Sequence, residues 1–509
     1  MRIEMKSKSK QSSAYQSRGL TRRNLLGFAG AAIASASIPS PGADLSPATR
    51  QYQISKLNSS VMNPLSAYMS EAATRALPEE VTEKTKQHIL DTLAAMISGS
   101  RLLPGRRSLQ FAEAYGGKPM SAVVASKLSC GAIEAALANG VLAHADETDD
   151  SHSPSQSHPG CAVVPGALAA GEQFGISGTH FIRAVALGYD IGTRVTMTLG
   201  GQEFEAASHW STHSIAPLFG AAAAASCAAS LNAQQMRWML GYTAQQSSGL
   251  GSWNRDTDHI LKAFLFGGMT ARSGVTSALL VQSGWTGVDD IFSGKDNFFA
   301  AYNAKADPSG LIDKLGERYE VTRTNIKKWP VGSPIQAALD ALVLLRQEYP
   351  FKADQVQQVE VRLATDEAAI VNNREIPDIC MQHILAIALI NNTVTFASAH
   401  DGALMKDPAV LRERAKTTLI PDAELQRLMP LRVAILEVTL TDGKKLSRRV
   451  DDVRGTPKNP MTRDEVLAKA RDLITPVLGA QKCTQLLARI FTFEDVADIR
   501  ELRPLLQLS

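Results

Sequence analysis

Cysteine is scarce in this chain, and the few cysteines are far apart. Among 509 residues none belongs to a Cys-x-x-Cys pair, and the five present are Cys130, Cys161, Cys227, Cys380 and Cys483. This spacing predicts neither a zinc site nor a disulfide framework. Thiols in apolar runs act as small hydrophobic groups, which is typical of a protein that folds in a reducing compartment.

The chain also lacks a strong excess of charge and the common nucleotide motifs. The formal net charge is +3, and no cluster of lysine and arginine is interleaved with aromatics, which make up 6% of the residues. We therefore expect no nucleic acid or acidic membrane surface as a partner. There is no GxGxxG after a strand, no P-loop and no GxSxG elbow. These absences disfavour nucleotide-dependent and flavin-dependent chemistry.

The N-terminal residues have the features of an export signal. Arg22 and Arg23 follow a basic, polar segment and precede a small-residue apolar stretch that runs to Ile38. Residues 1–43 thus resemble a disordered N-terminus with a twin-arginine signal peptide, which predicts a periplasmic or secreted protein. The alternative is a disordered basic tail with a chance arginine pair. No later segment is predicted to span a membrane.

Two hydrophobic patterns divide the remaining chain. From about Leu57 to Glu320 the pattern is helical and rich in alanine and glycine. After about residue 320, residues 359–363 and 436–440 alternate as half-buried strands do, and the second runs into the hairpin turn Asp442-Gly443. Helices are expected at 78–99, 131–145, 162–175, 178–197, 214–230, 233–248, 334–348, 378–392 and from Thr462 onward.

These patterns predict a mainly α fold. A large all-helical domain, residues 55–322 plus 463–507, is interrupted by a smaller α+β domain at residues 323–462. The C-terminal helices are expected to rejoin the first domain.

The stretch from His144 to Gly160 is the strongest candidate for chemistry. It places four carboxylates in five positions at the end of an alanine-rich helix, and His152 and His158 follow. Like charges beside a buried helix are costly unless they are paired, and such groups gather at functional sites because their pKa values shift. Two alternatives are a solvated acidic helix end and a divalent-metal site formed by aspartate and histidine.

Further candidates lie later in the chain. His209 and His213 flank Ser211 just before an alanine-rich helix, while Lys262 follows His259 in an apolar run and Lys327 lies at the predicted domain junction. Helix capping and surface lysines would explain each one alone. Together with the acidic loop, they suit proton transfer beside a carboxylate, with cations stabilising an enolate-like charge.

These motifs resemble the MmgE/PrpD family. The run from His144 to Ser151 is similar to the pattern His-x-x-[Asp/Glu]-x-Asp-Asp-[Thr/Ser], and His158-Pro159-Gly160 follows as in the family. Similar motifs are Gly188-Tyr189-Asp190, Phe219-Gly220-Ala221-Ala222-Ala223, Ala271-Arg272-Ser273-Gly274 and Lys327-Lys328-Trp329-Pro330. Family activities include methylcitrate dehydration, cis-aconitate decarboxylation and iminodisuccinate epimerisation. The resemblance implies a helical domain with an α+β lid, a homodimer, and no metal or organic cofactor.

The resemblance also implies roles for particular residues. Ser151 replaces the commoner threonine, Ser211 stands where the family usually has histidine, and Lys262 is displaced by one position. His209 or His213 would then take over the role of the missing histidine. The implied catalytic residues are Glu147, His158, His213, Lys262 and Lys327, and the implied substrate-binding residues are Asp150, Ser151 and Ser211.

We therefore expect a cofactor-independent lyase of the dehydratase or decarboxylase type, or an epimerase, that acts on a small di- or tricarboxylate. One alternative is a metal-assisted hydro-lyase that uses Asp149, Asp150 and His158. Another is a periplasmic carboxylate-binding protein that has lost catalysis, which the serine at Ser211 favours.

Overall fold

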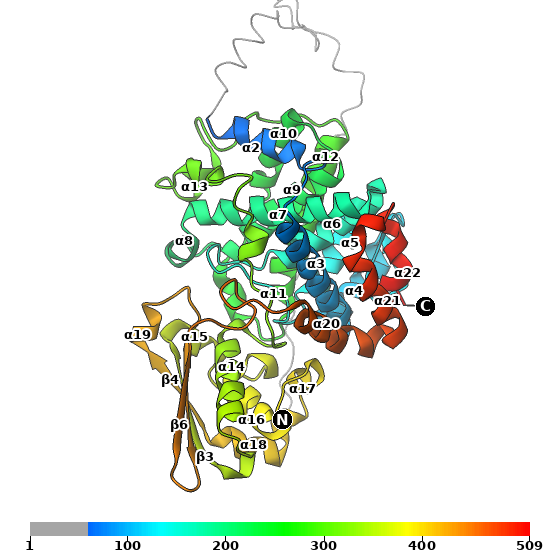
Figure 1. The fold of residues 1–509 in the computed structure, drawn as a ribbon. Coiled ribbons are helices and arrows are strands. Elements are labelled where there is room, and N and C mark those ends of the chain that lie inside the picture. The colour runs from blue at the N-terminus through cyan, green and yellow to red at the C-terminus, as the bar shows by residue number, and fades with distance from the viewer. Residues whose placement is uncertain (1–59, 509) are drawn as a thin grey trace, which may run out of the picture. The chain divides into compact units, whose positions relative to one another are not determined.

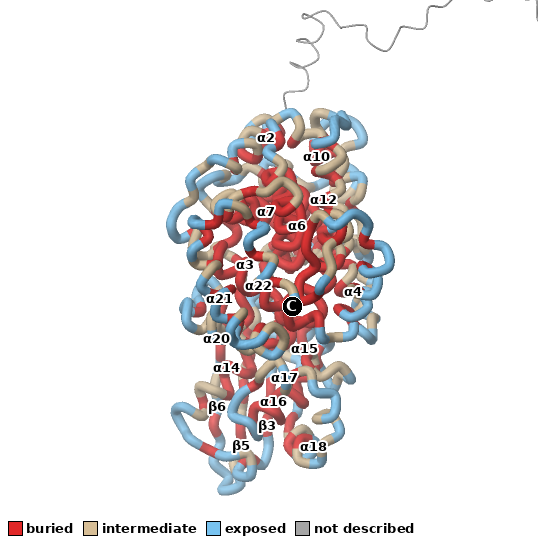
Figure 2. The backbone as a smooth tube through the Cα atoms, turned by 90° about the vertical axis from the view of Figure 1, so that its right-hand side faces the viewer, coloured by how far each residue is buried: buried red, intermediate tan, exposed pale blue. Residues whose placement is uncertain are grey.

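Small residues let three helices pack closely at the centre of the larger domain. In the computed structural model, which describes residues 60–508, these are α6 (Gly160–Phe174), α7 (Gly178–Leu199) and α9 (Thr212–Ala228). A Cβ atom at Gly192 of α7 would lie 2.3 Å from the carbonyl oxygen of Ala216, so only glycine permits this helix crossing. Most residues of α6 and α7 are buried (Figure 2).

The other elements of this domain surround those three helices. They include α2 (Met62–Glu71), α3 (Glu79–Gly99), α4 (Leu103–Tyr115), α5 (Ala132–Ala143), α8 (Gly201–Ser208), α10 (Ala233–Gln245), α11 (Ile260–Ala263), the π-helical turn η2 (Phe264–Gly268), α12 (Met269–Gln282), α13 (Phe298–Tyr302) and the 3₁₀ turn η4 (Glu320–Arg323). At the C-terminus, α20 (Arg463–Leu478), α21 (Ala480–Phe491) and α22 (Arg503–Leu506) return to this domain, and α20 packs against α3 (Figure 1).

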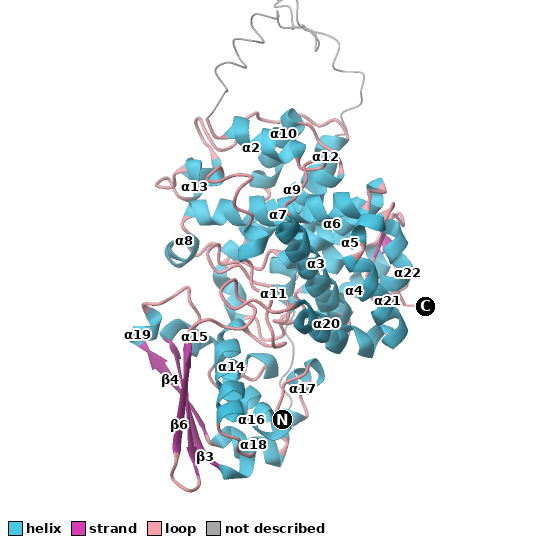
Figure 3. Cartoon of the chain, viewed as in Figure 1, coloured by secondary structure: helices cyan, strands magenta, loops and turns pink. Residues whose placement is uncertain are grey.

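The smaller domain is built on a four-stranded sheet. The strand order is β4 (Thr417–Asp422), β3 (Val356–Ala364), β5 (Ala434–Leu440), β6 (Lys445–Val450); β3 pairs parallel with β4 and antiparallel with β5. Its helices are α14 (Ser333–Glu348), α15 (Thr365–Val371), η6 (Pro377–Ile379), α16 (Met381–Asn391), α17 (Phe396–His400), α18 (Pro408–Ala415) and α19 (Ala423–Gln426). Helices α14 and α16 lie on one side of the sheet (Figure 3). We call this domain the lid.

Each domain has its own hydrophobic core. The lid core draws on buried residues between Trp329 and Val453. One core of the helical domain joins residues between Val81 and Ile326 with residues between Met461 and Leu506, on the far side of the lid in the sequence. The lid is therefore an insertion in the sequence of the larger domain.

The prediction of a mainly α fold with a smaller α+β part is confirmed. One detail of it differs, because the larger domain also holds a short antiparallel pair, β1 (Ser121–Ala122) and β2 (Ser129–Cys130). The helix expected at 378–392 is divided into η6 and α16. The predicted export signal at residues 1–43 lies outside the described residues.

One apolar helical segment within residues 60–508 is long enough to cross a membrane. It runs from Ile260 to Gln282, and 61% of its most apolar window is buried inside the protein. Core helices of globular domains pass the same length and composition test, so this segment is weak support for a membrane span.

Candidate active site

A cleft of about 850 Å³ lies between the helical domain and the lid. From the helical domain Glu147, His158, His213 and Lys262 line it, which brings together four of the five residues that the family resemblance implied as catalytic. The lid contributes residues from α14, α15, the segment before α16, and Met429 and Arg432.

The acidic loop that follows α5 is irregular but buried, so its polar groups need partners within the protein. The contacts of Asp150 illustrate how these partners are provided. One carboxylate oxygen accepts the N–H of Gly160 at 3.0 Å, and the other lies 2.8 Å from Nδ1 of His88 and accepts the hydroxyl of Tyr189. These contacts fasten the loop to α3, α6 and α7. The Asp150 carboxylate is therefore occupied by the protein and does not line the cleft.

A second anchor joins the loop to the C-terminal helices. Lys469 of α20 donates to the carbonyl oxygen of Thr148 at 2.9 Å and to Asp91 of α3 at 2.6 Å. His152 lies 3.2 Å from the carboxylate of Glu320 in η4. The loop is thus held from several sides, which keeps its charged groups in place for chemistry.

Glu147 is surrounded by cations. Its carboxylate forms an ion pair with Lys262 and lies 3.9 Å from Nδ1 of His259. Burial alone would raise the pKa of Glu147, but Lys262, His259 and Lys327 hold it well below its ordinary value. Glu147 is therefore ionised, and it keeps a cationic lysine at the cleft wall.

Asp149 lies between two histidines. Its carboxylate oxygens are 3.0 Å from Nδ1 of His144 and 3.3 Å from Nδ1 of His158. Burial would raise the pKa of Asp149, but the two histidines and Lys327 lower it well below its ordinary value. Such a carboxylate orients the imidazole that it contacts and fixes its tautomer.

His158 is neutral at neutral pH. Burial lowers its pKa to about 3; Asp149 opposes that change, and Lys327 adds to it. Nδ1 lies 3.3 Å from a carboxylate oxygen of Asp149, and neither of these two atoms has a hydrogen-bond partner within residues 60–508. A neutral imidazole that lies at a cleft beside a carboxylate can accept a proton.

The structure brings His213 next to His158. Their ring centroids are 5.5 Å apart, and His213 stacks on Phe266 with centroids 4.6 Å apart. Nδ1 of His213 lies 3.3 Å from Glu205 of α8. His209 also lines the cleft, but it is exposed and has no ring contact within the described chain. Of the two histidines, His213 is the one placed against the buried site.

A π-helical turn positions Lys262 and Phe266. The backbones of α5 and η2 touch here, because a Cβ atom at Gly140 would lie 2.3 Å from the carbonyl oxygen of Gly267. Single π-helical turns inside longer helices occur frequently at functional sites. The Lys262 ammonium lies 5.0 Å from the ring centroid of Trp253, which adds a cation–π contact to the ion pair with Glu147.

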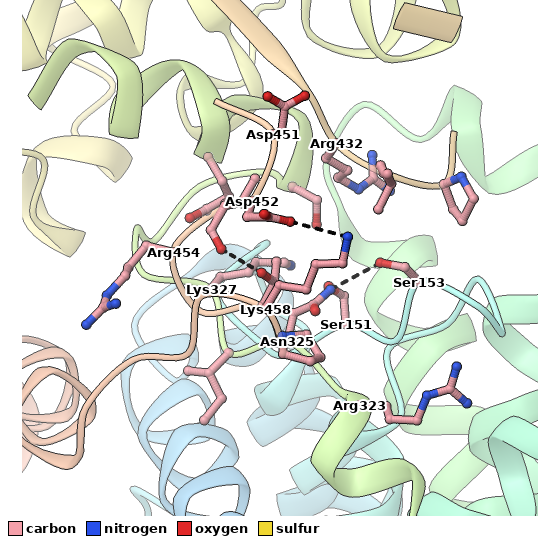
Figure 4. A pocket seen from close by; sticks show the side chains of 18 of the residues that line it. Ser151, Ser153, Arg323, Asn325, Lys327, Arg432, Asp451, Asp452, Arg454 and Lys458 are labelled. Atoms are coloured by element: carbon pink, nitrogen blue, oxygen red, sulfur yellow. Dashed lines mark hydrogen bonds and ion pairs between the residues drawn. The ribbon is translucent and has the colours of Figure 1, made fainter. Parts of the chain in front are cut away.

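Lys327 supports the acidic loop from behind. Its ammonium donates to the carbonyl oxygen of Glu147 at 2.7 Å and lies 3.7 Å from Asp149, and it lines a second, smaller cavity instead of the cleft. That cavity, of about 280 Å³, lies where the chain enters and leaves the lid (Figure 4). Ser151 also lines it and exchanges backbone hydrogen bonds with Asn325. We therefore treat Lys327 as a positioning residue.

Ser211 is the N-cap residue of α9, makes no side-chain capping hydrogen bond and is fully buried. Its hydroxyl has no hydrogen-bond partner among the described residues, and it does not line the cleft. The structure thus does not bring Asp150, Ser151 or Ser211 into the cleft lining, although the sequence assigned them to substrate binding. Asp150 and Ser151 hold the loop instead.

His400 was missed by the sequence reasoning. This lid residue reaches the acidic loop, with Nε2 2.9 Å from Asp146 and 3.8 Å from Asp378. Burial alone would lower the pKa of His400, but Asp146 and Asp378 raise it to about 9. His400 therefore carries a positive charge at neutral pH and links the lid to the loop. No local pattern marks the pair, because its members are far apart in the sequence.

Two buried groups of side chains have metal-ligand atoms within 4.8 Å of one another. They are His144 with Glu147 and His259, and His144 with Asp149 and Cys161. The ammonium of Lys262 beside Glu147 opposes a cation in the first group. In the second, burial raises the pKa of the Cys161 thiol well above its ordinary value, which keeps it protonated. The metal-assisted alternative was expected to use Asp149, Asp150 and His158. Asp149 and His158 lie together, but the Asp150 carboxylate contacts His88, Tyr189 and Gly160 instead.

The fold and the site define a class of protein in which a helical domain and an α+β lid enclose a cleft equipped for proton transfer. Two family models match this chain, the MmgE/PrpD N-terminal domain over residues 63–310 and the MmgE/PrpD C-terminal domain over residues 329–492. The chain belongs to the MmgE/PrpD family.

Curated relatives match over most of their length. A cis-aconitate decarboxylase-like protein, oryM, of Aspergillus oryzae is 25% identical over 474 residues, which cover 86% of this chain and 95% of the relative. A cis-aconitate decarboxylase of Aspergillus terreus is 24% identical, covering 90% and 98%. The human cis-aconitate decarboxylase is 24% identical, covering 85% and 91%.

Proposed function

We propose that this protein is a cofactor-independent lyase of the dehydratase or decarboxylase type, or an epimerase, that acts by proton transfer on a small di- or tricarboxylate. The observation that carries the proposal is His158, a neutral imidazole at the cleft between Asp149 and His213. Family membership and relatives named as cis-aconitate decarboxylases support a lyase reaction on a carboxylate.

In the proposed reaction His158 removes a proton from the carbon next to a carboxylate. The C–H bond breaks, the proton moves to Nε2, and the electron pair remains as an enolate-like charge. Loss of hydroxide, with a proton, then completes a dehydration; return of the proton to the opposite face completes an epimerisation. In a decarboxylation, the C–C bond breaks and CO₂ leaves first; the resulting carbanion then takes a proton that solvent delivers through His158, which is neutral before and after the step. A bound carboxylate would raise the pKa of His158 and strengthen it as a base.

Lys262 would stabilise the charge that develops on the substrate. Its ammonium lines the cleft and forms an ion pair with the ionised Glu147. A cation already in position acts without reorganisation when negative charge appears, which is the usual basis of electrostatic catalysis. His213, whose ring centroid lies 5.5 Å from that of His158, would be a second acid–base group beside it.

The test is α-proton exchange in deuterated solvent, measured by mass spectrometry over a panel of di- and tricarboxylates that includes citrate and cis-aconitate. We expect exchange or product with at least one member. Binding without exchange would instead support a carboxylate-binding protein. Activity lost on dialysis against a chelator and restored by a divalent ion would support the metal-assisted alternative, which was expected to use Asp149, Asp150 and His158.

We also propose export and dimerisation. Export rests on the signal-like residues 1–43, and dimerisation on the family resemblance. Fractionation of cells that express the full chain would test the first; enzyme retained in the cytoplasm would contradict it. Light scattering of the purified protein would test the second, with a monomer mass as the contradicting result.

A further inference from the structure

The cations that line the cleft differ in whether the protein itself neutralises them. Lys262 is paired with Glu147, and Arg432 is paired with the buried Glu367 at 2.6 Å. Arg255 and Arg374 have neither an ion pair nor a side-chain hydrogen bond within residues 60–508, but Arg255 is exposed to solvent, which leaves Arg374 as the half-buried cation without a partner. It lies on the lid between α15 and η6 and is half-buried.

A half-buried guanidinium without a counter-ion is costly, because it has lost part of its water without gaining an anion. The segment that carries Arg374 also presents apolar groups to the cleft, including Ile370 and Ile376. Apolar surroundings lower the local dielectric and strengthen the attraction of the cation for an incoming anion. The planar fork of arginine matches a carboxylate with two parallel hydrogen bonds.

The two walls of the cleft therefore offer different contacts. His158, His213 and Lys262 come from the helical domain, whereas Arg374 comes from the lid. A ligand with one carboxylate can engage either wall. A ligand with two or three carboxylates can bridge both walls and hold the lid to the helical domain.

We propose that Arg374 binds the substrate carboxylate that is remote from the reacting carbon, and so makes the enzyme selective for polycarboxylates. This inference rests on the proposed function and names a specificity-determining residue for it. Arg374 takes no part in the proton transfer, so its loss acts mainly on binding.

The test uses the full-length protein and three variants, Arg374→Gln, Arg374→Lys and Arg412→Gln. Arg412 is an exposed lid arginine of α18 that does not line the cleft, so its variant controls for loss of a positive charge on the lid. Isothermal titration with the panel member that wild type binds most tightly gives Kd, and turnover gives kcat and KM. We expect Arg374→Gln to raise Kd and KM by about 30-fold or more, since truncating one partner of a desolvated charge pair has effects of this size.

The other variants sharpen the test. Arg374→Lys keeps the charge but loses the fork, and we expect a smaller rise of about tenfold. In every Arg374 variant kcat should change much less than KM, and Arg412→Gln should match wild type. An unchanged Kd in Arg374→Gln, or a fall in kcat at constant KM, would overturn the assignment.

Monoamides of the same acid identify which carboxylate Arg374 contacts. One monoamide should bind wild type weakly and should lose nothing more in Arg374→Gln, because the partner of Arg374 is already gone. If every monoamide loses as much as the parent acid does, the inference is overturned. Wild-type binding without proton exchange would remove the proposed catalysis and leave the Arg374 result valid. A wild type that binds no polycarboxylate would overturn both proposals.

Discussion

His158 is buried and His400 is largely buried, yet their pKa values move in opposite directions. Burial lowers the pKa of His158 to about 3, although Asp149 lies 3.3 Å away, because that aspartate is shared with His144 and offset by Lys327. For His400, the contact with Asp146 at 2.9 Å overcomes burial and raises the pKa to about 9. The neighbouring charges thus leave one histidine free to accept a proton and make the other a fixed cation.

Replacing His158 with alanine should lower kcat by roughly two orders of magnitude or more, because general acid–base catalysis contributes about that much. Asp149 would keep its contacts with His144 and Lys327, so the melting temperature should change little. Steady-state turnover and thermal denaturation measure the two effects. His180→Gln is a matched control on α7, where His180 contacts a backbone oxygen away from the cleft. Near-normal turnover in His158→Ala would remove this residue from the mechanism.

Lys327 should behave differently from His158, because it holds the loop. Lys327→Met leaves the buried carbonyl oxygen of Glu147 without its donor, which typically costs about 1–3 kcal/mol of unfolding free energy. We expect both the stability to urea and kcat to fall. The ammonium of the adjacent Lys328 lies 4.7 Å from the centroid of the Trp329 ring and forms no hydrogen bond or ion pair within residues 60–508, so Lys328→Met serves as the control. Full stability in Lys327→Met would contradict this role.

The sequence located the acidic loop, the histidines and both lysines because each occurs in a recognisable local pattern. It did not separate the carboxylates that face the cleft from those that fasten the loop. Asp150 is held by His88 and Tyr189, residues remote in the sequence, so nothing near Asp150 reveals its partners. Roles of this kind depend on tertiary contacts.

Among the secondary-structure elements, the contact between α5 and η2 has the most direct bearing on the site. α5 ends at the acidic loop, and η2 carries Phe266 directly after Lys262 on α11. The two backbones meet at Gly140 and Gly267 with no room for a side chain. The spacing of these elements therefore sets the distance between the loop and the lysine that pairs with it.

Gly140→Ala should consequently weaken both stability and activity. Its new Cβ atom would meet backbone, which cannot move aside as a side chain can, so we expect a loss of about 1–3 kcal/mol or more in unfolding free energy. Gly402→Ala is the control, since a Cβ atom there meets nothing within 4 Å. Urea denaturation and turnover of both variants provide the measurement. Equal stability of the two variants would show that the helices can separate without loss.

Helix and strand periodicity predicted most elements of the fold, since the helices at 178–197 and 233–248 appear as α7 and α10. The strand β4 was not predicted. Its sequence includes Pro421 and Asp422, which are uncommon in strands, and it pairs parallel with β3 at the edge of the sheet. Edge strands tolerate such residues because one side needs no ladder bonds. The strand β4 is therefore recognised from its pairing with β3 and not from its own sequence.

For the whole molecule, His400 makes the attachment of the lid depend on pH. Its folded-state pKa of about 9 lies above the ordinary value of 6.5, so its stabilising contribution is complete below about pH 6.5 and disappears as the pH rises through about 9. Breaking a buried ion pair from one side typically costs about 3–5 kcal/mol.

We therefore expect His400→Gln to be less stable than wild type at pH 6.5 and nearly equal to it above pH 9. Thermal denaturation across this range measures the difference. His209→Gln, which removes an exposed histidine, should show no such convergence. A stability difference that stays constant from pH 6.5 to above pH 9 would rule out the ion pair as the link between lid and loop.

The return of α20–α22 to the first domain has a consequence for the order of folding during synthesis. The lid core lies within residues 329–453 and is complete before α20 leaves the ribosome, whereas the larger core still lacks the residues between Met461 and Leu506. At ordinary elongation rates this gap lasts roughly 2–10 s. The lid can fold as a unit while α3 still exposes the surface that α20 will cover. The acidic loop reaches its final contacts only after Lys469 has been synthesised, so the candidate site forms after the lid core.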